Sequence, residues 1–190
     1  MATDATIERC SWCEKDDLYR SYHDNEWGVE SHDDHHLFEH LILETFQAGL
    51  SWYTILKKRE NFRLAFDSFD ARKIALYGVK EEEILMSNSG IIRNKLKVKA
   101  AINNAQIFLK TQAEFETFDN YIWQFVNHRT IDNSLSSTSE IKATTPESDA
   151  MSKDMKKRGF KFVGSTTCYA FMQAVGMVND HVNSCWKKER

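Results

Sequence analysis

Apolar residues recur along most of the chain at spacings of three and four, the period of a helix with one buried face. The clearest stripe, at i, i+4, i+7 and i+11, consists of Leu37, Leu41, Glu44 and Ala48. Asp33 or Asp34 can cap this helix and Gly49 can end it. Glu44 therefore points along an apolar face, where an unpartnered carboxylate is costly. We expect the other side to face solvent, because it carries four histidines: His32, His35, His36 and His40.

The same period, together with cap and stop residues, predicts further helices. They are expected from Ser51 onward with Phe62 and Phe66 further on, from Asp70 to near Gly78, over 80–86, from about Asn94 to Lys110, over 118–126, from Thr145 to Gly159, and from Ser165 or Thr166 to Gly176. Residues 127–148 are polar and rich in Ser and Thr, which indicates one long loop. No repeat or linker divides the sequence. The prediction is an all-α protein folded as a single globular unit over residues 1–190.

The composition is that of a soluble globular protein, with 42% hydrophobic and 28% charged residues. No apolar run approaches the ~20 residues that cross a bilayer, so no membrane association is expected. The first residues, MATDATIERC, lack a basic start followed by an apolar stretch, and we expect a cytoplasmic protein. In that compartment the four cysteines are not expected to form disulfides. Nothing in the sequence demands a partner chain, which favours a monomer.

The formal net charge of −3 gives no overall case for nucleic-acid binding. Basic residues are nevertheless concentrated in 57–59, 91–99 and 153–161, whereas acidic residues cluster elsewhere, as at 81–83. Such an uneven distribution can make one face of the molecule basic. Each cluster is equally compatible with an ordinary solvated helix surface.

Cysteines and histidines near the two ends of the chain form a candidate metal site. Cys10 and His23 lie near one end, and His181 and Cys185, in H-x3-C spacing, lie near the other. Two thiolates and two imidazoles are a tetrahedral zinc set, and a closed site of this kind would be structural. It would join residues of about 1–30 to 165–190. Spacing alone leaves two alternatives open: Cys13 replaces His23, or these are free thiols and surface histidines.

Aromatic residues crowd the N-terminal segment and follow Glu44. They are Trp12, Tyr19, Tyr22, Trp27 and Trp52. The short polar segment YRSYHDNEWG cannot bury all of its rings on one helix face. Flat rings around one carboxylate suit a planar ligand that is cationic or rich in hydrogen-bond donors, with cation–π contacts worth roughly 0.5–2 kcal/mol each. A damaged purine fits that description.

Several blocks of sequence together resemble the DNA-3-methyladenine glycosylase I family. The blocks, which span about residues 8–186, are ERCSW, YHDNEWG, LETFQAGLSW, TILKKRENF, SGIIRNK, KKRGFKFVGSTTCYAFMQAVGMVNDH and the closing H-x3-C. The resemblance implies a helix–hairpin–helix DNA glycosylase fold with structural Zn2+. It also implies hydrolysis of the N-glycosidic bond of 3-methyladenine in alkylated double-stranded DNA, as in base excision repair. The products would be free 3-methyladenine and an abasic site.

The resemblance further implies roles for individual residues. The zinc ligands would be Cys10, His23, His181 and Cys185, without Cys13. Glu44 would be the acid of the base pocket; the rings would be Tyr22 and Trp52 around the base, with Trp12, Tyr19 and Trp27 nearby. Gly49 and Leu50 would form the wedge that fills the space left by the extruded nucleotide. The hairpin near 87–95 would hold a phosphate through Gly90, Ile91, Arg93 and Lys95.

The mechanism expected from these residues requires little activation of the leaving group by the protein. Glu44 is expected to stay ionised, to accept hydrogen bonds from the amino edge of the base, and to be compensated by the base's positive charge. Methylation at N3 already weakens the glycosidic bond, because the base departs neutral. Relatives with this hairpin commonly use an aspartate to stabilise the sugar cation, but residues 91–113 contain no Asp or Glu. Lys95 is expected to face a phosphate, not to form a Schiff base.

Two readings from other classes compete with this one. A zinc-stapled nucleic-acid-binding module without catalysis would keep the basic hairpin and the wedge but would not need Glu44 among aromatic rings. A small-molecule binder for cationic heterocycles would keep the ring-lined carboxylate, and its basic clusters would be ordinary surface.

Overall fold

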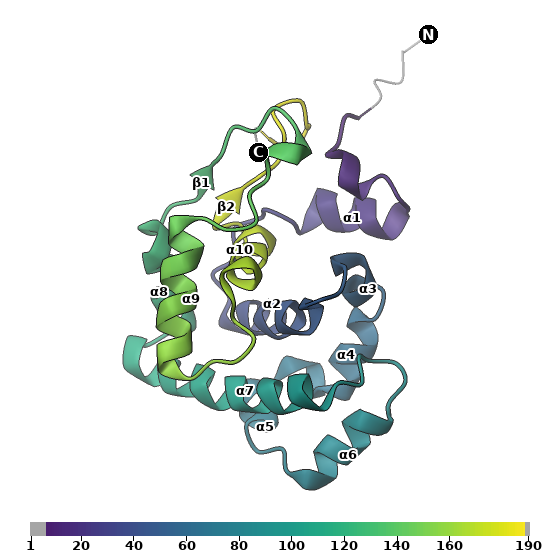
Figure 1. Cartoon of the computed structure of the whole chain (residues 1–190), viewed down its shortest axis with the longest axis vertical. Helices are drawn as coiled ribbons and strands as arrows, with labels where there is room; N and C mark the ends of the chain where they lie inside the picture. Colours follow the sequence, from purple (N-terminus) through teal and green to yellow (C-terminus); the bar gives the residue numbers. More distant parts are fainter. Residues whose placement is uncertain (1–6, 189–190) are drawn as a thin grey trace.

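The computed structural model describes residues 7–188, and these are predominantly helical (Figure 1). The α-helices are α1 (Asp17–Asn25), α2 (Asp34–Gln47), α3 (Trp52–Leu56), α4 (Arg59–Ala65), α5 (Ala71–Ile74), α6 (Val79–Ser87), α7 (Lys95–Phe115), α8 (Phe118–Trp123), α9 (Pro146–Arg158) and α10 (Ser165–Ala174). Short 3-10 turns are η1 (Ser11–Cys13), η2 (Asp67–Phe69), η3 (Gln124–Val126) and η4 (Thr138–Glu140). The all-α prediction is confirmed. None of the helices within 7–188 is long and apolar enough to cross a membrane.

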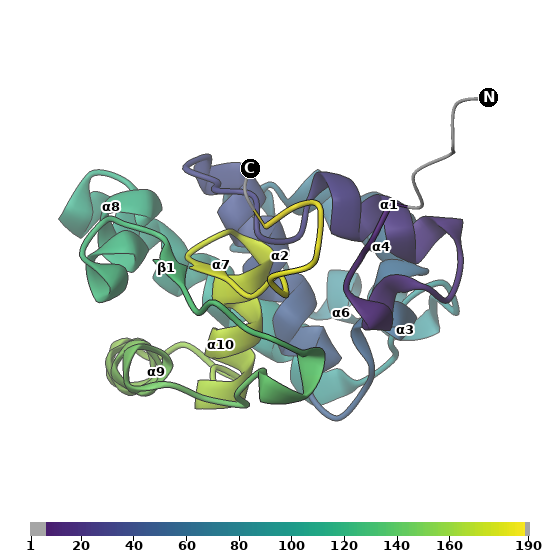
Figure 2. The ribbon, with the colours of Figure 1, turned by 90° about the horizontal axis from the view of Figure 1, so that it is seen from above.

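Helix α2 lies in the middle of the molecule, between α10 on one side and α7 on the other (Figures 1 and 2). It begins as predicted, because the Asp33 side chain accepts a hydrogen bond from the backbone N–H of His36 at 2.8 Å. It ends at Gln47, just before Gly49, whose φ of 78° is left-handed. Every residue from Leu37 to Phe46 is buried. The helix that carries Glu44 thus lies at the centre of the hydrophobic core.

Most of the predicted caps and boundaries are confirmed. Three predicted N-caps accept from backbone N–H groups in the next turn: Ser51, Asp70 and Thr145. Two predictions were too simple. The helix begun by Ser51 is interrupted at 57–58, giving α3 and α4, and α7 runs on to Phe115, where that ring packs against Tyr121 of the following helix at 5.1 Å.

The segment 127–148, predicted to be a loop, contains a short strand. Strand β1 (Ile131–Asp132) pairs in parallel with β2 (Val178–Asn179), and a further bridge joins Leu135 to Val182. Two-residue strands carry no periodicity, so the sequence pattern could not reveal them. The pairing holds the C-terminal segment, which lies at the same end of the molecule as η1 and α1 (Figure 1). There the Trp186 N–H donates to the carbonyl of Glu8 at 3.0 Å.

Candidate active site and metal centre

Glu44 is buried without a charged partner. Its side chain lies on α2, the residue is 3% exposed, and it lines a pocket of about 140 Å3. The other lining residues come from the turn after α2 and from the start of α10: Gln47, Ala48, Gly49, Leu50, Thr166, Thr167 and Ala170. Among the described residues no hydrogen-bond donor reaches its Oε2 atom. Burial alone raises the pKa of Glu44 from 4.5 to about 8, so the neutral acid predominates at pH 7.

Other buried polar atoms in this region also lack a partner within residues 7–188. They are His40 Nδ1, Gln47 Oε1 and Trp52 Nε1. Each such atom costs about 1–3 kcal/mol when it stays unsatisfied. Buried native polar groups normally have partners, and two of these exceptions, on Glu44 and Gln47, belong to residues that line the pocket, where a ligand could supply the missing hydrogen bonds. This part of the protein is therefore suited to bind a ligand that has its own hydrogen-bond donors and acceptors.

The prediction of a solvated histidine face on α2 is wrong for His40. This residue is 1% exposed, and its ring stacks against Trp52 with centroids 6.0 Å apart and planes 25° apart. The reason is that α3, α7 and α10 all pack against α2, which leaves its middle with no face open to water. Periodicity shows which face is most apolar but not that every face is covered. His40 thus supports the ring of Trp52 from within the core.

Tyr22 and Trp52 face each other beside Glu44. Their ring centroids are 5.2 Å apart and their planes are tilted by 43°. Burial, followed by the nearby carboxyl groups of Glu44 and Glu26, raises the pKa of Tyr22 well above 10. A flat base lying between two rings needs about 7 Å between them, twice the ~3.5 Å of ring contact. The two rings must therefore move apart before they can enclose a base.

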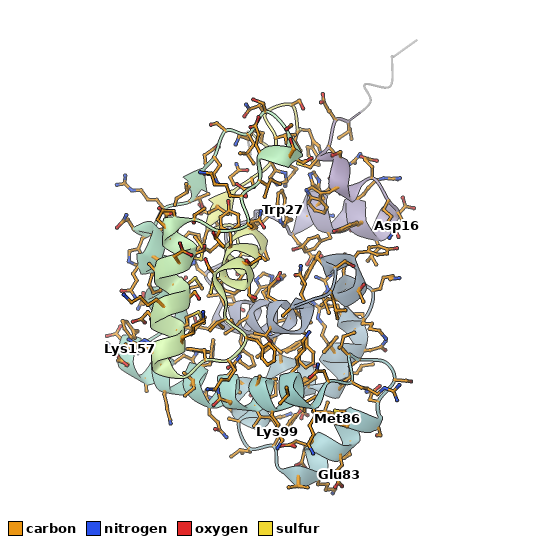
Figure 3. All side chains as sticks on the ribbon, viewed as in Figure 1. Asp16, Trp27, Glu83, Met86, Lys99 and Lys157 are labelled. Carbon is orange, nitrogen blue, oxygen red and sulfur yellow. The ribbon has the colours of Figure 1, made fainter. Side chains whose placement is uncertain are left out.

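The remaining aromatic residues connect this pair to the terminal cluster. The Trp12 ring contacts Tyr19 at 4.8 Å, Tyr22 at 6.4 Å and Trp27 at 4.9 Å. Trp27 in turn packs edge-on against His181 at 4.7 Å and lies between α1 and the C-terminal segment (Figure 3). Of the three rings expected near the base, Trp12 thus contacts Tyr22 directly, and Trp27 is one ring further away, between Trp12 and His181.

Cys10, His23, His181 and Cys185 come together as predicted. All four are buried, and their ligand atoms lie within 4.8 Å of one another. The sulfur-to-nitrogen distances are 3.4 Å from Cys185 to His23, 3.5 Å from Cys185 to His181 and 3.7 Å from Cys10 to His181. A tetrahedral ion with Zn–S near 2.3 Å and Zn–N near 2.05 Å requires about 3.6 Å between sulfur and nitrogen. The donor set and its dimensions fit a closed metal centre.

Neighbouring groups fix the two histidines for metal binding. His23 Nδ1 is 2.8 Å from an Asp24 oxygen, and His181 Nε2 is 3.1 Å from the carbonyl of Trp27. Each remaining ring nitrogen faces the cluster, the arrangement that usually orients histidine ligands. Burial lowers the pKa of both imidazoles, that of His181 to about 4, and so keeps them neutral. Cys13 lies outside the cluster, where its thiol donates to the carbonyl of Cys10 at 3.1 Å.

The predicted wedge lies in the turn between α2 and α3, and the predicted hairpin lies in the turn between α6 and α7. Leu50 is 41% exposed at the mouth of the Glu44 pocket and follows the left-handed Gly49. In the turn between α6 and α7, Ile91 is buried and the Gly90 N–H already donates to the Asn88 side chain at 2.8 Å.

The side chains of Arg93, in that turn, and of Lys95, the first residue of α7, are in contrast exposed. Asn94 caps α7 by accepting from two backbone N–H groups of its first turn. The backbone of the turn is therefore largely occupied, and the free cationic side chains are the groups able to meet a phosphate.

Three residues that sequence reasoning missed contribute to this region. Thr166 and Thr167 line the pocket from the first turn of α10, and they belong to the sequence block KKRGFKFVGSTTCYAFMQAVGMVNDH, which carries part of the family resemblance. Lys97 is 5% exposed and donates to two carbonyls at the end of α2. Its position four residues before the buried Ala101, on the apolar side of α7, was the available signal.

A helical protein with an unpartnered buried acid beside a pair of aromatic rings has a site suited to a small planar ligand that is cationic or rich in donors. Comparison with known proteins gives the family. The chain belongs to the methyladenine glycosylase family, whose model matches residues 12–188.

The similarity to individual members extends over almost the whole chain. The chain is 51% identical to DNA-3-methyladenine glycosylase 1 of Escherichia coli K12 over 179 residues, 94% of this chain and 96% of that protein. It is 47% identical to DNA-3-methyladenine glycosylase of Haemophilus influenzae over 177 residues, 93% of this chain and 96% of that protein. The fold matches a solved 3-methyladenine DNA glycosylase I from Staphylococcus aureus, studied for its recognition of 3-methyladenine, with a TM-score of 0.93, 34% identity and coverage of 97% and 98%.

Proposed function

We propose that this protein is a monofunctional DNA glycosylase that excises 3-methyladenine from alkylated DNA and leaves an abasic site for base excision repair. The observation that carries the proposal is Glu44, a buried acid without a partner in a chain whose relatives at 47–51% identity are 3-methyladenine glycosylases. The non-catalytic and small-molecule alternatives have no comparable support, because these relatives are named as enzymes. The chain acts as a monomer in this proposal.

Glu44 changes its protonation state when the base arrives. Sequence reasoning expected an ionised Glu44 throughout, but with a pKa of about 8 the free protein holds it mostly as the neutral acid at pH 7. A 3-methyladenine nucleotide carries a positive charge and an amino edge. Its entry favours the carboxylate, whose proton passes to solvent and whose oxygens accept from the amino edge. When the glycosidic bond breaks, the base becomes neutral, the carboxylate loses its counter-charge, and release of the product is favoured.

The target nucleotide reaches this site by leaving the base stack, which costs a few kcal/mol, roughly. Leu50 fills the space it vacates, and Tyr22 and Trp52 separate to enclose the ring. Because methylation already activates the leaving group, the absence of an acid in 91–113 is tolerated. Water attacks the sugar and no Schiff base forms at Lys95, so borohydride is not expected to trap a covalent enzyme–DNA adduct.

The turn between α6 and α7 serves as the hairpin of a helix–hairpin–helix motif. Its exposed Arg93 and Lys95 neutralise phosphates on the lesion strand, while Gly90 and Ile91 keep the turn in shape. Packing also favours glycine at position 90, because a Cβ there would lie 2.9 Å from the Asn88 side-chain oxygen.

The terminal cluster binds structural Zn2+ through Cys10, His23, His181 and Cys185. Four protein ligands leave no open position for substrate, so the ion supplies cohesion between the two ends of the chain and takes no part in the reaction. The Trp12 and Trp27 rings pack against the two histidine ligands, so the cluster also stabilises the aromatic packing next to Tyr22.

The test compares wild type with Glu44→Gln on DNA treated with a methylating agent. Bases released into the supernatant are separated and quantified, and each protein is also titrated with free 3-methyladenine. We expect wild type to release 3-methyladenine and the variant to lose both excision and free-base affinity. Unchanged excision and affinity in the variant would remove Glu44 from the site, and no release by wild type would refute the proposed function.

A further inference from the structure

Lys97 is a buried cation at the junction of α7 and α2. Its Nζ atom donates to the carbonyl of Phe46 at 2.8 Å and to the carbonyl of Ala48 at 2.6 Å. The residue is 5% exposed, and no carboxylate within the described residues pairs with it. The carbonyls at the end of α2 are the negative pole of that helix, so the ammonium group is placed where the helix dipole favours it.

A second lysine connects the same two parts of the chain in the opposite direction. Lys58, between α3 and α4, donates to the carbonyls of Ser89 and Gly90, both at 3.2 Å. The segment 46–58 and the segment 89–97 are therefore joined twice, each by a lysine that reaches carbonyls of the other. The first segment contains the wedge Leu50, and the second contains the exposed cations of the hairpin.

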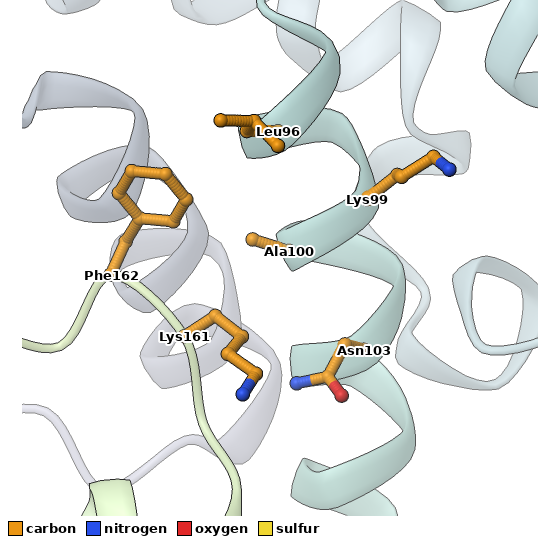
Figure 4. Close-up of a pocket in the computed structure, with 6 residues that line it drawn as sticks. All are labelled: Leu96, Lys99, Ala100, Asn103, Lys161 and Phe162. Carbon is orange, nitrogen blue, oxygen red and sulfur yellow. The ribbon is translucent and has the colours of Figure 1, made fainter.

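The position of Lys97 excludes direct contact with DNA. Its neighbours on α7, Leu96 and Lys99, are 69% and 54% exposed, and together with Phe162 they line a separate pocket on the surface of the helix (Figure 4). Lys97 instead points to the opposite side, toward the end of α2. A phosphate held by the hairpin cannot reach its ammonium group through the protein interior.

We propose that Lys97 is a positioning residue that fixes the wedge turn relative to the phosphate-binding hairpin. The proposal rests on the function proposed above. Its two acceptors, at 46 and 48, lie just before Leu50 in sequence, so one hydrogen-bonded group holds the turn that carries the wedge. DNA bound by the hairpin is thereby held at a fixed distance from the residue that must enter the duplex.

Replacement of Lys97 by methionine keeps most of the side-chain volume and removes the donor. It also leaves the carbonyls of Phe46 and Ala48 without this donor, so some loss of stability is expected whether or not Lys97 positions the wedge. The positioning role is therefore measured as excision by the folded variant and not as stability.

The experiment is a double-mutant cycle with Leu50→Ala and Lys97→Met, read as the single-turnover rate of 3-methyladenine release from a duplex at saturating protein. We expect each single variant to be slower by about 10-fold, since a misplacement of about 1 Å costs up to ~100-fold in rate. The double variant should be no more than about 2-fold slower than the slower single variant, because both changes disable the same step. Lys97→Arg should restore part of the rate, and Lys110→Met, an exposed lysine on the same helix, is the matched control.

Affinity for free 3-methyladenine distinguishes positioning from damage to the pocket. It should stay within about 2-fold of wild type in Lys97→Met, because the free base needs neither wedge nor hairpin. Rate losses that multiply in the double variant, a Lys97→Met rate equal to wild type, or a parallel loss of free-base affinity would each overturn the inference. Lys97→Gln carries the same cycle if Lys97→Met does not fold. A wild type that releases no base would instead refute the proposed function, and the inference with it.

Discussion

Replacing Glu44 by glutamine should change how the free energy of unfolding depends on pH. The pKa of Glu44 in the folded protein gives the sign and the magnitude of that change. The folded protein holds this carboxyl at a pKa of about 8, against 4.5 for an exposed glutamate. Between these values the folded state binds more protons than the unfolded state, so wild type loses stability as pH rises from about 4.5 to about 8. At about 1.4 kcal/mol per pH unit, the full penalty is on the order of 5 kcal/mol above pH 8, and about 3 kcal/mol at pH 7.

The assay is urea unfolding of wild type and Glu44→Gln at pH 5, 7 and 8.5, followed by tryptophan fluorescence. Titration of other groups cancels in the difference between the two proteins, since the substitution adds no charge. We expect the variant to gain about 4 kcal/mol relative to wild type between pH 5 and pH 8.5. Parallel stability curves would mean that Glu44 reaches water or a cation, and the reasoning about a carboxyl kept for a cationic ligand would then be wrong.

Three further outcomes are expected. Cys10→Ser should lose bound zinc and unfold at a lower temperature, whereas Cys13→Ser should retain a full equivalent by metal analysis; equal metal content in both would contradict the ligand set. Leu50→Ala should slow excision from duplex DNA by about 10-fold while its melting temperature changes little, because this side chain is 41% exposed. Gly176→Ala should cost at least ~2 kcal/mol in chemical denaturation, since φ is 76° and the new Cβ would lie 2.4 Å from the Glu30 backbone nitrogen; Gly164→Ala, with nothing within 4 Å, is its control.

Much of the fold was predictable because its helices carry local signals. Capping residues such as Asp33, Ser51 and Thr145 act within one turn, so they identify helix starts without knowledge of the rest of the chain. The position of Glu44 on an apolar stripe was visible for the same reason. Residue type and spacing indicated a metal cluster but left Cys13 as an alternative ligand; the family resemblance implied the set without Cys13, and the structure brings those four side chains together.

What the sequence did not reveal depends on contacts between distant segments. The burial of His40 follows from three helices that pack around α2, and the pairing of β1 with β2 joins residues 47 positions apart. The role of Lys97 depends on carbonyls at the end of another helix, which no pattern along α7 identifies. The spacing of Tyr22 and Trp52, too close for a base to lie between them, is likewise a property of packing.

Because His181 and Cys185 are two of the four clustered side chains, the cluster cannot close until nearly all of the described chain has left the ribosome. The rings of Trp12 and Trp27 pack against its histidines and against each other, and the Trp12 ring in turn contacts Tyr22. The packing behind Tyr22 is thus completed last during synthesis. A nascent or truncated chain that stops before residue 181 would hold Glu44 and Leu50 but would lack His181, against which the Trp27 ring packs.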